Sequence, residues 1–166
     1  MTVRHVFRHL PYPPDDLHNL AWDVEDYPSF IHFITALRIL KKTPTNMRAE
    51  VRVRYKVLRE SFITDVRRDL DTKEIFVSLA HGPLRTLENH WRFHPLSDGS
   101  TLVEFWVEFS FSIPWLGKIF RNKALRAEHQ ILQAFETQAS KRFTPISTSA
   151  LMDKEIADLQ ALRQHG

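Results

Sequence analysis

The sequence predicts an α+β fold in which one antiparallel sheet grips a long C-terminal helix. A short helical segment is followed by about six strand-like segments joined by short turns, and short turns connect antiparallel neighbours. The last of these strands, residues 101–111, carries a one-sided apolar pattern that needs a cover. The segment from Pro114 to about Phe143 has an apolar stripe at helical spacing that can supply this cover. Runs of strands with helices at the ends are typical of α+β domains.

The strand at residues 101–111 has two very different faces, because successive side chains alternate across a strand. One face carries Val103, Phe105, Val107, Phe109 and Phe111. The other carries Leu102, Glu104, Trp106, Glu108 and Ser110, and we expect it to be solvated. The helical stripe consists of Leu116, Phe120, Ala124, Ala127, Ile131, Phe135 and Ala139. Between the apolar wall and the stripe lies either a filled core or a pocket.

The N-terminal part of the chain predicts one strand, one helix and a second strand. Residues 2–9 alternate like a strand, which the following prolines end. Asp15 and Asp16 then lie where a helix N-terminus favours acidic side chains, and apolar residues follow at helical spacing as far as Val24. We expect Pro28 to break this helix. Residues 30–42 begin irregularly and end as the second strand.

The centre of the chain predicts four more strands before the one at 101–111. The third strand, residues 47–57, alternates apolar residues with Arg48, Glu50, Arg52, Arg54 and Lys56. This pattern indicates one buried and one solvated face, as in an antiparallel sheet. The strands that follow cover residues 60–70, 75–79 and 87–95, with turns at 43–46, 71–73 and 81–83.

The hairpin before residue 101 has two allowed registers. Inner positions are odd-numbered on both strands, so opposed residues sum to an even number and the loop has an odd length. A loop at residues 97–99 sets Arg92 opposite Glu104, which is favourable, and Glu88 opposite Glu108, which is not. A loop at residues 98–100 sets His90 opposite Glu108 instead. The sequence leaves both registers open.

The totals predict one domain, residues 1–143, followed by a linker and a short C-terminal helix or a frayed tail at 144–166. Cysteine is absent, which excludes disulfides and a thiolate nucleophile. No apolar run is long enough to span a bilayer, and the N-terminal alternation leaves no room for a removable targeting segment. We therefore expect a cytoplasmic protein, with peripheral contact at the inner membrane allowed. The net charge of +3 permits an anionic membrane or RNA as a partner.

Several segments resemble the START-like helix-grip superfamily, and more narrowly the coenzyme Q-binding protein and ribosome-association toxin RatA family, which is polyketide cyclase/dehydrase-like. They are Asp23-Val-Glu-Asp-Tyr-Pro-Ser-Phe30, Glu60-Ser-Phe62 and Gly82-Pro-Leu-Arg-Thr-Leu-Glu-Asn-His-Trp-Arg-Phe93. Val103-Glu-Phe105 and Phe109-Ser-Phe111 continue the likeness, which covers roughly residues 2–143. The chain departs from the family at Ile31-His-Phe-Ile34, near the expected pocket mouth.

The resemblance implies a curved antiparallel sheet wrapped around the C-terminal helix, with an apolar cavity between them. It implies non-catalytic binding of a polyprenyl quinone such as ubiquinone, or a similar lipid, in support of ubiquinone biosynthesis, delivery and respiration. The alternative function is that of a ribosome-associated toxin-type regulator that blocks subunit association. A third, weaker alternative is a cyclase-like enzyme, because polyketide cyclases are similar in fold.

The candidate cavity wall is apolar with two polar positions. It consists of Phe62, Thr64, Asn89, Trp91, Phe93, Phe105, Val107, Phe109, Phe111, Leu116, Phe120 and Ile131. A quinone needs apolar walls for its tail and a few polar groups for its head. Asn89 or Thr64 can donate a hydrogen bond to a quinone carbonyl; alternatively, each satisfies backbone groups or buried water. Residue pattern alone favours a filled core, whereas the resemblance favours a cavity.

Two surfaces are candidates for contact with larger partners. The start of the long helix carries Trp115, Lys118, Ile119, Arg121 and Lys123, which suit an anionic membrane surface; the alternative is an ordinary helix packed on the sheet. The basic face of the third strand, with Arg67 and Arg68 near it, suits ribosomal phosphates; the alternative is a solvated outer face.

Enzymatic motifs are missing from the sequence. No Gly-rich phosphate loop or nucleophile elbow occurs, and histidines four apart lie on strands, where they are too distant to share a metal. Paired carboxylates need a cleft, and Glu104 and Glu108 are expected on the solvated face. We therefore predict no catalytic residue, no metal and no cofactor apart from ubiquinone as a bound ligand, and no DNA partner.

Overall fold

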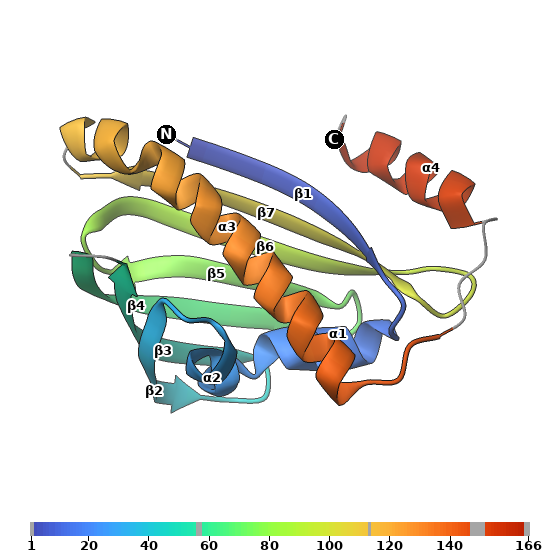
Figure 1. Cartoon of the computed structure of the whole chain (residues 1–166). Coiled ribbons are helices and arrows are strands. Elements are labelled where there is room, and N and C mark those ends of the chain that lie inside the picture. The colour runs from blue at the N-terminus through green and yellow to red at the C-terminus, as the bar shows by residue number, and fades with distance from the viewer. Residues whose placement is uncertain (1, 56–57, 113, 147–151, 165–166) are drawn as a thin grey trace.

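A curved antiparallel sheet and a long helix dominate the molecule (Figure 1). The computed structural model describes residues 2–55, 58–112, 114–146 and 152–164, with the backbone alone at residues 55, 58, 114–127 and 152. Within these ranges the sheet has seven strands, and the helices between residues 14 and 30 and at 114–142 lie at its concave face. The predicted α+β class is confirmed.

The strands follow one another around the sheet in chain order, except at one edge. They are β1 (Thr2–Leu10), β2 (Ile34–Lys42), β3 (Asn46–Tyr55), β4 (Leu58–Asp69), β5 (Glu74–His81), β6 (Leu84–Pro95) and β7 (Thr101–Phe111). The helices are α1 (Pro14–Trp22), the 3₁₀ turn η1 (Val24–Asp26), α2 (Tyr27–Phe30), α3 (Pro114–Arg142) and α4 (Met152–Gln164). The spatial order is β1-β7-β6-β5-β4-β3-β2, so the first strand pairs with the last. Every adjacent pair is antiparallel.

The hairpin between β6 and β7 adopts the first of the two allowed registers. Arg92 lies opposite Glu104, and Glu88 lies opposite Glu108. The loop is closed by a hydrogen bond of 2.9 Å from Leu96 N to Ser100 O. Gly99 has a φ of 89°, a left-handed conformation that glycine adopts without strain. This loop therefore explains why the favourable pair and the unfavourable pair occur together.

The first helix ends earlier than the sequence predicted. Helix α1 stops at Trp22, where Asp23 N donates to Asn19 O at 3.0 Å, and the turn η1 follows. Pro28 does not break a helix, so that prediction was wrong; it lies in the first turn of α2. A proline is well tolerated there because first-turn N–H groups have no partner within the helix.

The core lies between the concave face of the sheet and the helices α1 and α3 (Figure 1). Trp91 is at its centre, with ring centroids 4.8 Å from Phe105, 5.1 Å from Phe135 and 5.9 Å from Phe93. The inner residues predicted for β7 from Val103 to Phe109 are buried, which confirms the facing of that strand. Their period-2 pattern thus matches the surface that α3 covers.

The outer face of β7 is not solvated throughout, which corrects the sequence prediction. Leu102 is fully buried and Glu104 is only 2% exposed. Helix α4 covers this part of the sheet, because its residues Ile156 and Leu159 pack against Leu96 and Leu102. The C-terminal segment is therefore a docked helix, and the alternative of a frayed tail was wrong.

The carboxylate of Glu104, on β7, contacts side chains from β1, β6 and α4. Its Oε2 lies 2.7 Å from His5 Nε2, its Oε1 lies 2.8 Å from His94 Nε2, and Arg163 Nε donates to Oε1 at 3.0 Å. Arg92 Nη1 is 3.5 Å from Oε2. Burial alone would raise the pKa of Glu104, but the hydrogen bonds to His94 and His5 and the charge of Arg92 lower it overall. The carboxylate is thus held ionised between β1, β6, β7 and α4.

Candidate ligand cavity

A cavity of about 240 Å³ lies between the concave sheet face and the helical layer. Its wall is drawn from α1, η1, α2, α3 and strands β2 to β7. The lining residues are Ala21, Val24, Tyr27, Ile31, Ile34, Leu37, Ala49, Val51, Val53, Phe62, Thr64, Val66, Ile75, Val77, Leu87, Asn89, Trp91, Phe105, Val107 and Ile131. Most are aliphatic or aromatic, so the cavity offers an apolar environment.

Seven of the residues expected on the wall lie there. They are Phe62, Thr64, Asn89, Trp91, Phe105, Val107 and Ile131. Phe93 does not line the cavity, because it is buried in the filled core against His18, Trp91 and Phe135. Phe109 and Phe111 also lie off the lining and contact each other edge to face. The side chains of Leu116 and Phe120 are outside the described residues.

The sequence missed the lining residues that come from the segment between β1 and β2. Ala21, Val24, Tyr27 and Ile31 close one side of the cavity. Alternation along β3 placed its apolar residues on the inner face, a signal that could have added Ala49 to the wall. In the α1–α2 segment, the helical spacing of apolar residues up to Val24 indicated a buried face, but this spacing does not distinguish a cavity wall from a filled core.

The polar groups of the cavity are already bonded within the protein. Asn89 Nδ2 donates to Trp106 O at 2.9 Å, and Asn89 Oδ1 accepts from Trp91 Nε1 at 2.8 Å. Thr64 Oγ1 donates to Ala49 O at 3.4 Å. Tyr27 donates from its hydroxyl to Ala21 O at 2.5 Å, and burial raises the pKa of this tyrosine. These groups orient the wall, and they leave the interior suited to an apolar ligand.

Gly82 sets the position of a wall residue. A Cβ atom at this position would lie 2.9 Å from Cδ1 of Phe62 and 3.1 Å from Cδ1 of Leu79. The ring of Phe62, which lines the cavity, therefore occupies space that any larger residue at position 82 would need. This contact gives a physical reason for glycine in the Gly82-Pro-Leu segment.

A surface groove of about 430 Å³ begins at the edge of the cavity, between α2 and α3. Ile31 lines both spaces, so the groove adjoins the cavity wall. The groove is more polar: its other lining residues are Ser29, Phe30, His32, Phe33, Gln130, Gln133, Ala134, Thr137, Gln138 and Lys141. Amide groups and a cation thus lie next to an apolar interior.

The candidate membrane surface cannot be placed, since the side chains of Trp115, Lys118, Ile119, Arg121 and Lys123 lie outside the described residues. No helix in the described ranges is long and apolar enough to cross a membrane. In the same part of the chain, no group of three or more His, Asp or Glu side chains is arranged to hold a metal ion.

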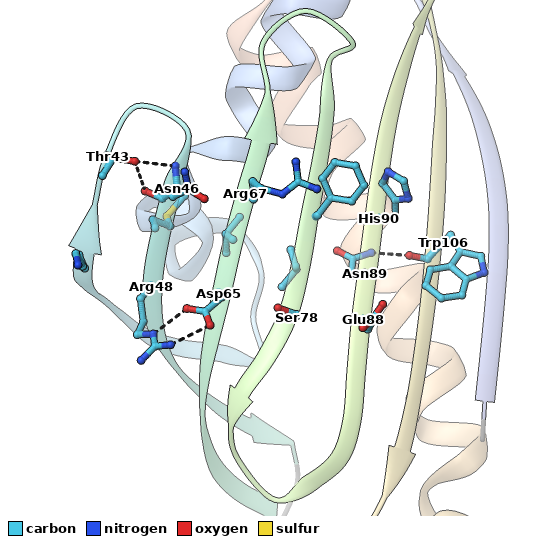
Figure 2. Close-up of a pocket in the computed structure, with 15 residues that line it drawn as sticks. Thr43, Asn46, Arg48, Asp65, Arg67, Ser78, Glu88, Asn89, His90 and Trp106 are labelled. Carbon is cyan, nitrogen blue, oxygen red and sulfur yellow. Dashed lines mark hydrogen bonds and ion pairs between the residues drawn. The ribbon is translucent and has the colours of Figure 1, made fainter.

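The predicted basic surface is partly neutralised. Arg48 makes a two-pronged ion pair with Asp65, at 2.7 and 3.0 Å (Figure 2). Arg52 Nε lies 3.9 Å from Glu50. Arg68 lies at the edge of the core, with its guanidinium 4.5 Å from the ring centroid of Trp22, and does not belong to the outer face. Lys56 is outside the described residues. Arg54 and Arg67 remain exposed.

An apolar cavity enclosed between a curved sheet and one long helix is the arrangement of a known protein family. The model of the family "Polyketide cyclase / dehydrase and lipid transport" matches residues 10–136. The chain belongs to this family. This polyketide cyclase and lipid transport family contains proteins that transform ligands and proteins that carry them, so membership fixes the fold and leaves the function open.

Curated relatives of this family member have two kinds of name. The ribosome association toxin RatA of Escherichia coli K12 is 31% identical over 140 residues, which cover 81% of this chain and 85% of the relative. The mitochondrial coenzyme Q-binding protein of Schizosaccharomyces pombe is 28% identical over 136 residues, which cover 80% of this chain and 83% of the relative. These relatives are named as a toxin and as a binding protein.

Solved structures agree with the family fold. An 18 kDa protein from Caulobacter crescentus is 38% identical, with a TM-score of 0.70 over 85% of this chain and 97% of the other. A START superfamily protein from Mycobacterium smegmatis is 19% identical, with a TM-score of 0.74 over 85% of this chain and 99% of the other. The helix-grip, START-like architecture expected from the sequence is therefore confirmed.

Proposed function

We propose that the protein binds a polyprenyl quinone such as ubiquinone in its cavity and does not transform it. The observation that supports this proposal is an apolar cavity whose polar groups are hydrogen-bonded within the protein itself. Such a wall favours a hydrocarbon tail, since burying apolar surface is the main term for a ligand of this kind. The name of the coenzyme Q-binding relative supports a quinone over other lipids.

The cavity size favours partial insertion of the ligand. Ligand pockets usually measure about 300–1,000 Å³, so a space of about 240 Å³ holds only part of a polyprenyl quinone. We place the tail inside and the head group at the groove between α2 and α3. Gln130 and Gln133 offer amide N–H donors there for the quinone carbonyls. This placement differs from a head group bound at Asn89, whose amide is engaged with Trp106 and Trp91.

The wall also favours carriage over catalysis. General acid–base chemistry needs a titratable group whose pKa is near the working pH and whose proton can reach the substrate. Among the described lining residues the ionisable side chain is Tyr27, and burial raises its pKa away from neutrality. Its hydroxyl proton is also donated to a backbone carbonyl. The tail of a bound quinone would meet hydrocarbon and aromatic groups, which do not move protons.

Ligand extraction with a cavity-filling variant tests this proposal. Protein purified from a quinone-producing host is expected to yield near-stoichiometric quinone on organic extraction and mass spectrometry. Ala49→Leu places extra methyl groups in the cavity, because Ala49 is buried on its wall, and should lower the quinone content several-fold. The matched control is Ala36→Leu on the same sheet, where the side chain is exposed and outside the cavity.

An empty protein from a quinone-rich host would contradict the proposal. Equal quinone content in the two leucine variants would also contradict it, because the ligand would then be bound outside the cavity. Circular dichroism of both variants distinguishes loss of ligand from loss of fold.

Ribosome association is the second candidate function. It is favoured by the names of the RatA relatives and by exposed cations on the outer face near the β2 edge, such as Arg38, Lys41, Arg54 and Arg59. Such a surface suits ribosomal RNA, whose phosphates dominate binding to basic proteins. The chain is then expected to co-sediment with ribosomal subunits at low salt and to dissociate as salt rises. Sedimentation that does not depend on salt would contradict a phosphate contact.

A further inference from the structure

A row of four side chains crosses the outer face of the sheet, on the side away from the cavity. Arg67 lies opposite Phe76, Phe76 lies opposite His90, and His90 lies opposite Trp106 in the strand registers. The row therefore runs across β4, β5, β6 and β7, and Figure 2 labels Arg67, His90 and Trp106 on three of these strands. We call these four residues the outer aromatic row.

The row forms the floor of a groove of about 860 Å³, large enough for a nucleotide. The Arg67 guanidinium carbon lies 4.1 Å from the centroid of Phe76, and the rings of Phe76 and His90 are 4.0 Å apart. Burial lowers the pKa of His90, so its ring is neutral near pH 7 and stacks like an uncharged aromatic group. All four side chains keep some exposure to solvent.

The two kinds of charge are separated along this groove. Lys41 and Arg67 are exposed at the β2–β4 end, and no ion pair joins either of them to a carboxylate within the described ranges. Arg48 also lies there but is paired with Asp65. Cations free of carboxylates are the usual partners of phosphate groups.

A carboxylate lines the groove beside the aromatic row. Glu88 lies directly opposite Glu108, and in the described part of the chain no cation pairs with either. Like charges in opposed positions destabilise a sheet. Unfavourable local arrangements of this kind are expected where a side chain serves a ligand. Glu88 has two oxygens that accept hydrogen bonds and no donor of its own.

We propose that this groove binds single-stranded RNA with an unpaired guanine stacked on the outer aromatic row. The base lies over His90 and Trp106, and the backbone phosphates meet Arg67 and Lys41. Glu88 accepts hydrogen bonds from N1–H and the 2-amino group of guanine. Guanine is the RNA base with two adjacent donors on one edge, which match the two oxygens of a carboxylate.

Single-stranded RNA fits the groove better than a duplex does. Proteins bind single strands through aromatic side chains on which bases stack and through cations that follow the backbone, and this groove has both. In duplex RNA the base faces are stacked on one another and the base edges are paired, so neither the row nor Glu88 would find a partner. The site deepens the second candidate function by naming its RNA-binding surface.

Binding of short RNA to the full chain tests the site without ribosomes. Fluorescence anisotropy should show tighter binding of an octamer of alternating adenine and guanine than of one with adenine and cytosine. Trp106→Leu should weaken guanine-octamer binding roughly tenfold, and Phe76→Leu tests the same row on another strand.

Glu88→Gln should remove the guanine preference, because an amide offers one acceptor oxygen only. Arg67→Gln should lower the slope of log affinity against log salt by about 0.7, whereas Arg85→Gln, an exposed arginine outside the groove, should not.

Several results would overturn the site. They are equal affinity for the two octamers, a guanine preference that survives Glu88→Gln, or unchanged binding in both aromatic variants. Guanosine monophosphate that binds as tightly as the octamer would replace RNA with a free nucleotide. Ribosome association that fails while octamer binding succeeds would contradict the second candidate function and leave this site standing.

Discussion

Replacing Glu104 with alanine is expected to lower the free energy of unfolding by about 3 kcal/mol, the low end for breaking a buried ion pair. The change leaves four basic side chains without their common acceptor. The loss stays at the low end because these partners retain 20–35% side-chain exposure, so water partly replaces the carboxylate. Urea unfolding followed by circular dichroism measures the difference.

The matched control is Glu108→Ala, four residues further along β7 on the same face. Glu108 opposes Glu88, so removing it relieves a like-charge contact and should change stability by about 0.5 kcal/mol or less. Equal losses in the two variants would show that the cluster beneath α4 contributes nothing special. Limited proteolysis should also cleave α4 faster in Glu104→Ala, because Arg163 loses its partner.

The contribution of Glu104 to the free energy of unfolding should decrease as the pH is lowered. Its pKa in the folded protein is lowered, so the unfolded chain binds the proton more readily. The stabilisation is therefore fully present above the unfolded glutamate pKa of about 4.3 and is lost as pH falls through the folded value. Between about pH 5 and pH 3 the parent should lose stability more steeply than Glu104→Ala.

Replacing Trp91 with alanine is expected to cost about 3–5 kcal/mol, the range for removing a large buried aromatic side chain. Trp91 is 4% exposed and contacts three phenylalanine rings. It also donates to Asn89 Oδ1, so the change removes a hydrogen bond at the cavity wall. The midpoint of urea unfolding, with the slope held constant, measures the loss.

Trp91→Phe separates packing from hydrogen bonding at this position. The ring contacts are largely kept while the N–H is lost, so the expected cost is about 1–3 kcal/mol for an acceptor left unsatisfied. Identical losses for the alanine and phenylalanine variants would contradict the packing account. A loss under about 1 kcal/mol in Trp91→Ala would show that the surrounding rings collapse into the space.

Much of the fold could be predicted because the side chains of each antiparallel strand alternate between the two faces of the sheet. Each residue from Val103 to Phe109 on the inner face of β7 carries the same signal as its neighbours two places away. The register of the β6–β7 hairpin was narrowed to two by parity, and the three-residue loop with Gly99 at positive φ decided it. The facing of β7 and the register of the β6–β7 hairpin therefore both depend on local geometry.

Other features depend on segments that the local pattern does not report. Glu104 was expected in solvent, yet its cover includes Arg163, which lies 59 residues later in the chain. A strand pattern shows which residues share a face, and it says nothing about which distant helix covers that face. For a related reason, the residue pattern did not distinguish a cavity from a filled core. Trp91 and Phe93 face the same side of the sheet, but of these two only Trp91 lines the cavity. The difference depends on how close the opposing helices approach.

The pairing of β1 with β7 means that the first strand to be synthesised is among the last to find its place. His5 and its partner Glu104 are separated by 99 residues. At translation rates of about 5–20 residues per second, β1 waits roughly 5–20 s for β7 to be made. During that time the apolar side of the growing sheet lacks the helix α3, which follows β7. The nascent chain is therefore expected to need chaperone protection, and it closes its sheet only after β7 leaves the exit tunnel.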